Sequence, residues 1–291
     1  MSENRASAYR FFPGCLARTK LPHIEVSVRR VLERLGIGLE DDARFTCCPD
    51  PVVFRSSSRS DWLSLAARNL SLDGEKPIVT LCPGCASSLS EARHLLSEDP
   101  GSRTDAAARI GKLGLDLNLP PVSHFLEILF DEERMKEIAA GVKRRLDGLR
   151  IACHYGCHLT RPSDAVDFDD PEKPRCLDEL VALVGAESIT YEDKYLCCGR
   201  PSLDEETSTG ILERKLSAMK EAGAQAIVLA CPFCFEQFDV GQTLLERKTG
   251  RKYGLPVFYL SQLLCLAMGG TASELGLDMH KVKAEGIEGV E

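Results

Sequence analysis

The chain has 291 residues, of which 44% are hydrophobic and 27% are charged, and its formal net charge is −8. This length allows two domains of ordinary size, and the composition is that of a folded globular protein. The acidic balance gives no electrostatic reason to bind nucleic acid or anionic lipid, and no apolar run approaches the roughly twenty residues of a membrane helix. Residues 1–10 lack the apolar stretch of a secretory signal, so we expect a cytoplasmic protein without a membrane span.

The first half of the chain predicts strands that alternate with helices. Gly36 ends the first long helical pattern, and Asp61 is a good N-cap for the second. In chain order, we expect a strand over 9–12, helices over 24–35 and 61–72, a strand over 77–81 and a helix over 86–96.

The second half repeats this order of elements. We expect a strand over 149–152, helices over 175–184 and 205–222, a strand over 226–230 and a helix over 236–248. Each half then closes on a short apolar strand and helix, which begin at Pro121 and at Pro256. The duplication therefore covers nearly the whole chain.

This alternation predicts an α/β fold of two tandem domains, each a small parallel sheet flanked by helices. Because the order of elements repeats, we expect the domains to be related by a pseudo-twofold axis. We place the domains at 1–133 and 149–268, with a charged helical connector at 134–148. The tail at 269–291 is weakly patterned, and we expect a loose end or a segment that docks a partner.

Ten of the 13 cysteines form one pattern that occurs twice. Each copy has a Gly-Cys, an adjacent Cys-Cys pair and a CxxC. In the two copies 31 and 39 residues separate the first cysteine from the pair, and 33 and 32 separate the pair from the CxxC. Two five-thiol sets at near-equal spacing indicate two equivalent soft-metal sites that face each other across the pseudo-twofold axis. The first set is Cys15, Cys47, Cys48, Cys82 and Cys85, and the second is Cys157, Cys197, Cys198, Cys231 and Cys234.

The number of thiols bears on the kind of metal. Cytosolic thiols stay reduced, which argues against disulfides. A structural zinc site takes four ligands in a closed tetrahedron, whereas each copy here offers five. The side chains of adjacent cysteines in an extended segment point apart, so such a pair suits different irons of one cluster better than a single ion. We therefore favour iron–sulfur clusters, with structural zinc and dithiol chemistry as alternatives.

The repeated GC…CC…CxxC order resembles the duplicated CCG domain in the B subunit of heterodisulfide reductase. This family includes the related B-type proteins of sulfur-oxidising heterodisulfide reductase-like complexes. The resemblance covers about residues 8–268. Besides the cysteine order, it rests on the stretches Phe11-Phe12-Pro13-Gly14-Cys15, Cys153-His154-Tyr155-Gly156-Cys157-His158 and Cys197-Cys198-Gly199-Arg200-Pro201.

The resemblance implies an oxidoreductase acting on sulfur groups, with two non-cubane 4Fe–4S clusters that are each held by one five-cysteine set. A disulfide sits between the clusters and is converted to thiols by two-electron chemistry. The substrate is either a coenzyme heterodisulfide, as in methanogens, or a carrier-bound sulfur species, as in sulfur oxidation. The polar residues 1–8 ahead of the first strand mildly favour a member from outside the methanogens.

The resemblance also implies partner proteins. The chain lacks the close-spaced cysteine run of cubane clusters and has no P-loop or GxGxxG stretch. We therefore expect two partners that resemble the C and A subunits of heterodisulfide reductase, a cubane iron–sulfur protein and a flavin-containing protein respectively. Two alternatives for the chain itself are an electron-relay protein without substrate chemistry and a zinc-stabilised interaction scaffold.

Several residues leave the ligand and proton chemistry open. Pro49 stands where the CCG motif has glycine, and it removes a backbone N–H available to a cluster sulfur, so we expect an altered potential or pocket shape. Either Cys153 or Cys157 is a ligand, and the match to Gly14-Cys15 favours Cys157. His154 and His158 are candidate catalytic proton donors or structural histidines.

The remaining candidates have weaker patterns. Cys176 and Cys265 are expected to be buried apolar thiols on helices. Arg161, Lys194 and Arg200 are either anchors for an anionic substrate or, more simply, solvated surface charges.

Overall fold

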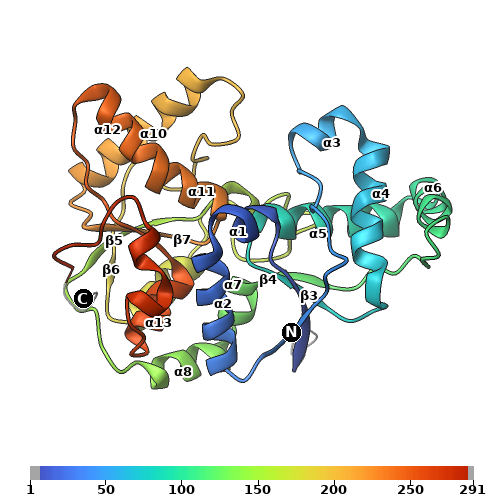
Figure 1. The fold of residues 1–291 in the computed structure, drawn as a ribbon, viewed down its shortest axis with the longest axis horizontal. Coiled ribbons are helices and arrows are strands. Elements are labelled where there is room, and N and C mark those ends of the chain that lie inside the picture. Colours follow the sequence, from blue (N-terminus) through green and yellow to red (C-terminus); the bar gives the residue numbers. More distant parts are fainter. Residues whose placement is uncertain (1–6, 288–291) are drawn as a thin grey trace.

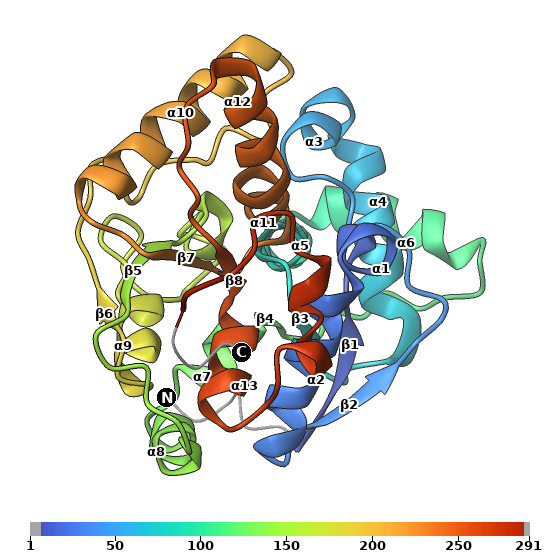
Figure 2. The same ribbon diagram turned by 60° about the vertical axis from the view of Figure 1, so that its left-hand side comes forward.

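The structure is a computed structural model that describes residues 7–287, in which two four-stranded parallel sheets form the centre of the molecule (Figures 1 and 2). The first sheet has the order β2-β1-β3-β4, with strands β1 (Ala8–Phe12), β2 (Gly38–Asp41), β3 (Ile78–Thr80) and β4 (Val122–His124). The second has the order β6-β5-β7-β8, with strands β5 (Arg150–His154), β6 (Glu187–Ser188), β7 (Ala226–Leu229) and β8 (Val257–Tyr259).

The two sheets share connectivity and register. Phe12, the last residue of β1, pairs with Thr80, and His154, the last residue of β5, pairs with Leu229. The predicted α/β fold with two tandem parallel sheets is confirmed. The edge strands β2 and β6 are not predicted from the sequence, because both are short and polar and lack an apolar alternation.

The helices of the first half flank its sheet and mostly match the predicted ranges. The second long helix begins earlier than expected, because Ser58 and not Asp61 is its N-cap, with the Ser58 hydroxyl accepting the Asp61 N–H at 3.4 Å. The helices are α1 (Cys15–Lys20), α2 (Pro22–Arg34), α3 (Val53–Ser57), α4 (Arg59–Leu70), α5 (Pro83–Glu98), α6 (Pro100–Gly111), α7 (Phe125–Leu129) and α8 (Glu132–Gly141).

The helices of the second half follow the same plan. The helix predicted over 236–248 begins at Pro232 and contains a π-helical segment, Gln237–Gly241, between α11 and α12. The helices are α9 (Cys176–Leu183), α10 (Glu205–Glu221), α11 (Pro232–Glu236), α12 (Gln242–Thr249) and α13 (Leu260–Ala267).

The halves pack crosswise through their helices. Helix α13 of the second half lies against α2 of the first, and α9 lies against α8 (Figure 2). The hydroxyls of Ser27 on α2 and Ser261 on α13 are 2.7 Å apart, and Arg34 donates to the carbonyl of Cys265 at 3.3 Å. Cys176 and Cys265 are fully buried, as expected of apolar thiols. One hydrophobic core therefore joins both halves.

The C-terminal segment packs on this core. Leu275, Leu277 and Ile287 are buried, and the Asp239 carboxylate accepts the backbone N–H of Lys281 at 2.9 Å. The expectation of a loose end is therefore wrong over 269–287. Residues 1–6 of the first predicted domain and 288–291 of the tail lie outside the described residues, and the domain boundaries remain predictions. Within 7–287, no helix is both long and apolar enough to span a membrane.

Candidate metal centre

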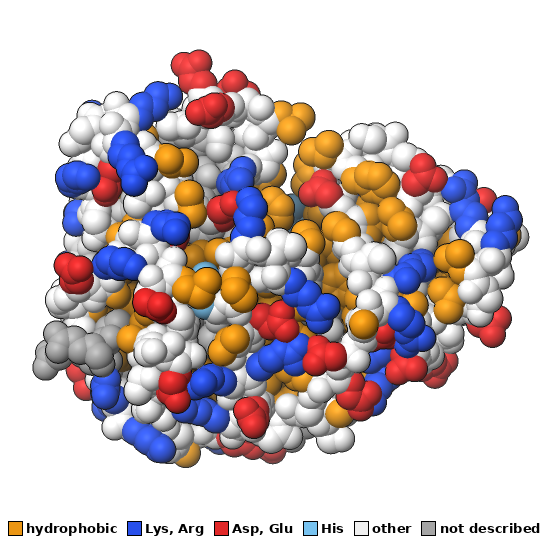
Figure 3. All heavy atoms as spheres, viewed as in Figure 1, with side chains coloured by type: hydrophobic (Ala, Val, Ile, Leu, Met, Phe, Trp, Pro, Cys, Tyr) orange, Lys and Arg blue, Asp and Glu red, His pale blue; other side chains and the backbone are white. Residues whose placement is uncertain are grey.

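All ten cysteines of the two sets line one cavity of about 110 Å³ between the halves. Hydrophobic side chains border the hollow between the two lobes of the molecule in Figure 3. Both thiol sets thus open on the same space, as the predicted facing arrangement requires. The other lining residues are Pro13, Gly14, Leu16, Ala17, Asp50, Pro51, Val52, Pro83, Gly84, Gly156, His158, Pro201, Pro232 and Phe233.

The carboxyl ends of parallel strands bring the cysteines together. Cys15 and Cys157 follow the central strands β1 and β5, and each CxxC begins the helix after β3 or β7. Because proline occupies N1 of α5 and of α11, the first CxxC cysteine is the N-cap and the second lies in the first turn. The positive end of each helix dipole therefore faces the thiols, where it favours thiolate.

Glycines make room for the sulfur atoms. Gly14 has a φ of 75° and Gly156 a φ of 72°, a region that disfavours side chains. A Cβ at Gly14 would lie 3.0 Å from the Cys85 sulfur, and one at Gly156 would lie 3.6 Å from the Cys234 sulfur. The Gly-Cys element of the pattern is thus explained by the backbone conformation at both positions and, at Gly14, also by this close approach.

The ten thiols interact in an unbroken series. Within each half, five thiols follow one another, and the series crosses between the halves where Cys82 meets Cys231. A continuous set of ten soft sulfur donors fits iron–sulfur ligation. The order of contacts is Cys15, Cys47, Cys48, Cys85, Cys82, Cys231, Cys234, Cys198, Cys197 and Cys157.

These contacts lower the pKa of selected thiols. Interaction with the Cys47 thiol lowers the pKa of Cys48 to about 6, and interaction with the Cys157 thiol lowers the pKa of Cys197 to about 2. Interaction with the facing thiol of the other half holds the pKa of Cys82 well below its usual value. The same contacts raise the pKa of the partner thiols, such as Cys157 beside Cys197. The first set therefore contains two thiols and the second set one that favour the thiolate form, which is the form that ligates metals.

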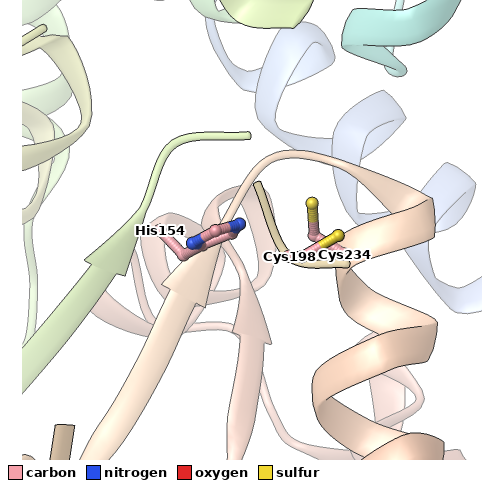
Figure 4. Close-up of side chains that lie close together, drawn as sticks. All are labelled: His154, Cys198 and Cys234. Carbon is pink, nitrogen blue, oxygen red and sulfur yellow. The ribbon is translucent and has the colours of Figure 1, made fainter. Parts of the chain in front are cut away.

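The two predicted histidines occupy different places. His158 lines the cavity, and its Nδ1 lies 3.4 Å from the Cys157 sulfur. His154 is fully buried and does not line the cavity, although its ring lies within 4.8 Å of the sulfurs of Cys198 and Cys234 (Figure 4). A proton-donor role stays a prediction for both, and the geometry favours His158.

The structure also distinguishes Cys153 from Cys157 as a candidate ligand. Cys153 is fully buried on β5, accepts a hydrogen bond from the Ser188 hydroxyl at 3.3 Å and does not line the cavity. Cys157 lines the cavity. This arrangement favours Cys157 as the ligand.

The three basic residues considered as substrate anchors already have partners. Lys194 is buried in an ion pair with Asp178 at 2.6 Å, so the expectation of a solvated charge is wrong there. Arg200 pairs with Glu236 at 2.9 Å, and Arg161 donates to the backbone carbonyl of Pro171. None of the three lines the cavity.

Two residues at the seam between the halves are not predicted from the sequence. Tyr259 donates to the carbonyl of Ala230 at 2.7 Å and also contacts that of Leu81, and His124 Nε2 lies 3.0 Å from the Leu81 oxygen. They occupy equivalent positions, as the last residues of β4 and β8. That equivalence in the repeat is the only sequence signal that marks them.

Comparison with known proteins identifies the repeated unit. A family model described as a cysteine-rich CCG domain matches residues 9–90 and again 151–239. A solved structure of a hypothetical protein from Helicobacter pylori superposes with a TM-score of 0.77 at 16% identity. It covers 96% of this chain and 53% of its own, and it supports the fold alone.

Curated relatives share most of the chain. The B subunit of ferredoxin:CoB-CoM heterodisulfide reductase from Methanosarcina mazei is 38% identical, covering 94% of this chain and 93% of its own. A protein of Archaeoglobus profundus named as similar to the heterodisulfide reductase B subunit is 32% identical over 90% of each chain. The 8-methylmenaquinol:fumarate reductase membrane anchor subunit of Wolinella succinogenes is 27% identical, covering 95% of this chain and 97% of its own. By its two cysteine-rich domains and this identity, the chain belongs to the CCG-domain family of the heterodisulfide reductase B subunit.

Proposed function

We propose that the chain is the catalytic iron–sulfur subunit of a heterodisulfide reductase-like complex. The observation that carries the proposal is that both five-thiol sets line a single cavity. A substrate with two sulfur ends can therefore meet both sets at once. The reaction is R–S–S–R′ + 2e⁻ + 2H⁺ → R–SH + R′–SH, or its reverse, and a persulfide on a carrier protein is the other candidate substrate.

We infer two non-cubane 4Fe–4S clusters, one held by each five-cysteine set. Five thiolates per site exceed the four ligands of a closed zinc tetrahedron, and the continuous contact of ten sulfurs leaves no isolated group of four. When bound, the clusters supply the two electrons and iron sites for sulfur. The chain itself supplies the thiolates, the shape of the cavity and a proton.

The walls of the cavity suit sulfur chemistry. Leu16, Val52 and Phe233 give it an apolar lining, which limits water around a reactive thiolate. His158 is the ionisable side chain beside the Cys157 sulfur, and we assign to it the transfer of a proton to a departing thiolate sulfur. Leu16 follows Cys15 in the first set as His158 follows Cys157 in the second, so this assignment applies to the second side only.

The electrons require a partner. We propose that they are exchanged, in the cytoplasm, with a cubane iron–sulfur protein that resembles the C subunit of heterodisulfide reductase. That protein is in turn linked to a flavin-containing protein that resembles the A subunit. The Methanosarcina mazei relative is named for the CoB-CoM heterodisulfide, and this supports a coenzyme heterodisulfide as one substrate class. Carrier-bound sulfur is the other class.

A pure electron relay is the second candidate function. It is favoured by the Wolinella succinogenes relative, whose name refers to 8-methylmenaquinol and fumarate and to no disulfide. The two candidates differ in whether a thiol or disulfide binds in the cavity.

The test begins with anaerobically purified protein. We expect about eight irons and a matching sulfide content per chain, as two four-iron clusters require. We also expect the EPR spectrum of the oxidised protein to change when a thiol substrate is added. Zinc without iron would overturn the proposal, and iron–sulfur signals that ignore both thiols and disulfides would favour the relay.

A further inference from the structure

The two thiol sets differ in the side chains that lie behind them. β1 and β5 end at equivalent positions, occupied by Phe12 in the first half and by His154 in the second. Phe12 packs edge-on against Phe45, with ring centroids 4.9 Å apart. The first set is therefore backed by a hydrocarbon ring at this position, and the second by an imidazole.

His154 has no hydrogen-bond partner within the described part of the chain. The side chain is fully buried, and neither Nδ1 nor Nε2 is bonded. A neutral imidazole always carries one N–H, and burying a donor without an acceptor costs about 1–3 kcal/mol. Figure 4 shows one edge of the ring facing the sulfurs of Cys198 and Cys234. Phe238 also packs against the ring, with centroids 4.9 Å apart, but its side chain has no hydrogen-bond acceptor. We therefore take the two sulfurs as the acceptors for the imidazole N–H.

A buried lysine lies near the same thiols. Lys215 on α10 is fully buried, and its Nζ donates to the carbonyl of Asp193 at 2.5 Å. Burial lowers the pKa of Lys215 to about 8, whereas the Asp193 carboxylate and, after it, the thiolates of Cys234, Cys198 and Cys197 raise it. The ammonium group therefore lies near the thiols of the second set. The residue at the same distance before the first CxxC is Ala66, which is also buried.

A backbone donor adds to this difference. The N–H of Gly199 donates to the Cys197 sulfur at 3.3 Å. Pro49 occupies the equivalent place after the first Cys-Cys pair and has no N–H. The second half therefore has a backbone donor to a cysteine sulfur that the first half, with Pro49, lacks.

The basic groups of the first half do not compensate. His124 lies close to Cys82, but its Nε2 is 3.0 Å from the Leu81 carbonyl and its Nδ1 accepts the Leu126 N–H at 3.3 Å. Both ring nitrogens are therefore occupied by backbone. Arg10, the buried arginine of β1, donates to the carbonyls of Leu70 and Lys76, and the charges that act on it are those of Asp73, Asp42 and Arg44 and not those of the thiols.

We propose that His154 and Lys215 are positioning residues that give the second iron–sulfur site a higher reduction potential than the first. His154 donates its N–H to a cysteine sulfur of that site, and Lys215 supplies a fixed positive charge. Hydrogen bonds to cluster sulfurs and nearby positive charge stabilise the more negative, reduced state. The inference rests on the proposed function, since it assumes a cluster in each set. It adds an order of reduction to that function, because the first electron to arrive resides at the second site.

The principal test is an EPR-monitored redox titration of the anaerobic protein and of His154→Phe, which copies the first half. We expect two midpoint potentials in the unaltered protein. In His154→Phe we expect the higher midpoint potential to fall by at least about 59 mV, which is a tenfold change in the one-electron equilibrium constant. The lower midpoint potential should be unchanged. Lys215→Met should act in the same direction, and His154→Gln, which keeps an N–H, should retain most of the difference.

Lys194→Met is the matched control. Lys194 is also buried in the second half, but its charge is paired with Asp178. Its removal should leave both potentials unchanged at equal iron and sulfide content. The converse variant Phe12→His should raise the lower potential and narrow the gap.

A second measurement needs no change at position 154. Protein with ¹⁵N-labelled histidine, in a His158→Leu background, should show a weak nitrogen coupling to the cluster signal by pulsed EPR. No coupling, or potentials unchanged in His154→Phe, would overturn the inference and leave the proposed function intact. A strong coupling would also overturn it, because His154 would then be a direct iron ligand. Protein without iron–sulfur clusters would refute the proposed function itself.

Discussion

The glycine before each first cysteine offers a matched perturbation. Alanine at Gly14 (φ 75°, ψ 175°) or at Gly156 (φ 72°, ψ 137°) enters a backbone region used almost only by glycine, which costs roughly 1–3 kcal/mol of unfolding free energy. Alanine at Gly36 (φ 67°) enters a positive-φ conformation, which costs roughly 1–2 kcal/mol. The three sites differ in what the new methyl group meets. It would lie 3.0 Å from the Cys85 sulfur at Gly14 and 3.6 Å from the Cys234 sulfur at Gly156, and nothing lies within 4 Å at Gly36.

The 3.0 Å contact is too close for carbon and sulfur, so either the Cys85 side chain or the backbone beside Cys15 must move by a few tenths of an ångström. Cys85 and Cys15 are both ligands of the first proposed cluster. We therefore expect Gly14→Ala to retain about half of the iron of the unaltered protein, and Gly156→Ala to retain nearly all of it. Gly36→Ala, which is far from the cavity, should lose stability alone.

The assay is iron and sulfide content per chain after anaerobic purification, combined with urea unfolding. Unfolding measures the backbone strain of each variant, and the iron content measures the contact specific to Gly14. Equal iron content in Gly14→Ala and Gly36→Ala would refute the reasoning. It would show that the first thiol set adapts to the methyl group or holds no cluster.

Three further outcomes follow from the site and the core. Cys157→Ser should lower the iron content and Cys153→Ser should not, as elemental analysis of both variants will test. His158→Leu should reduce disulfide turnover by at least about 100-fold at unchanged iron content, the usual scale for loss of a general acid; turnover within twofold of the unaltered protein would exclude that role. Burial lowers the pKa of His23 to about 4 and that of His280 to about 3, so both take up protons on unfolding. Their contribution to stability is complete above about pH 6.5 and is lost as the pH falls toward 4, with about 2 kcal/mol lost at pH 5 for His23; urea unfolding of His23→Leu should show a correspondingly smaller loss between pH 7 and pH 5.

The central strands and the thiol sets could be predicted because their signals are local. A run such as residues 226–230 is apolar throughout, as a strand buried on both faces requires, and it leads directly into CxxC. The edge strands β2 and β6 carry no such signal, since both are polar and become strands only by pairing with β1 and β5. The packing of the C-terminal segment could not be predicted either, because its anchor, Asp239, belongs to a distant helix.

The roles of the histidines could not be read from spacing alone. Successive residues of a strand point to opposite faces, and which face meets the thiols depends on the helices packed there. Cys153 therefore bonds Ser188 on one side of β5, and His154 lies against the thiols on the other. His158 comes after the strand has ended and reaches the cavity. The sequence motif contains Cys153, His154 and His158 together, and it does not show that the three side chains have different environments.

A duplication within one chain allows the two halves to diverge while they share a cavity. A symmetric dimer of single domains would carry the same residue behind both thiol sets. Here Phe12 and His154 occupy one pair of equivalent positions, and Leu16 and His158 occupy another. If the substrate is a disulfide with two different ends, each end leaves as a different thiol and needs different proton and electron supply. Divergence therefore includes positions where the two halves of such a reaction would differ, and the ten thiols remain common to both.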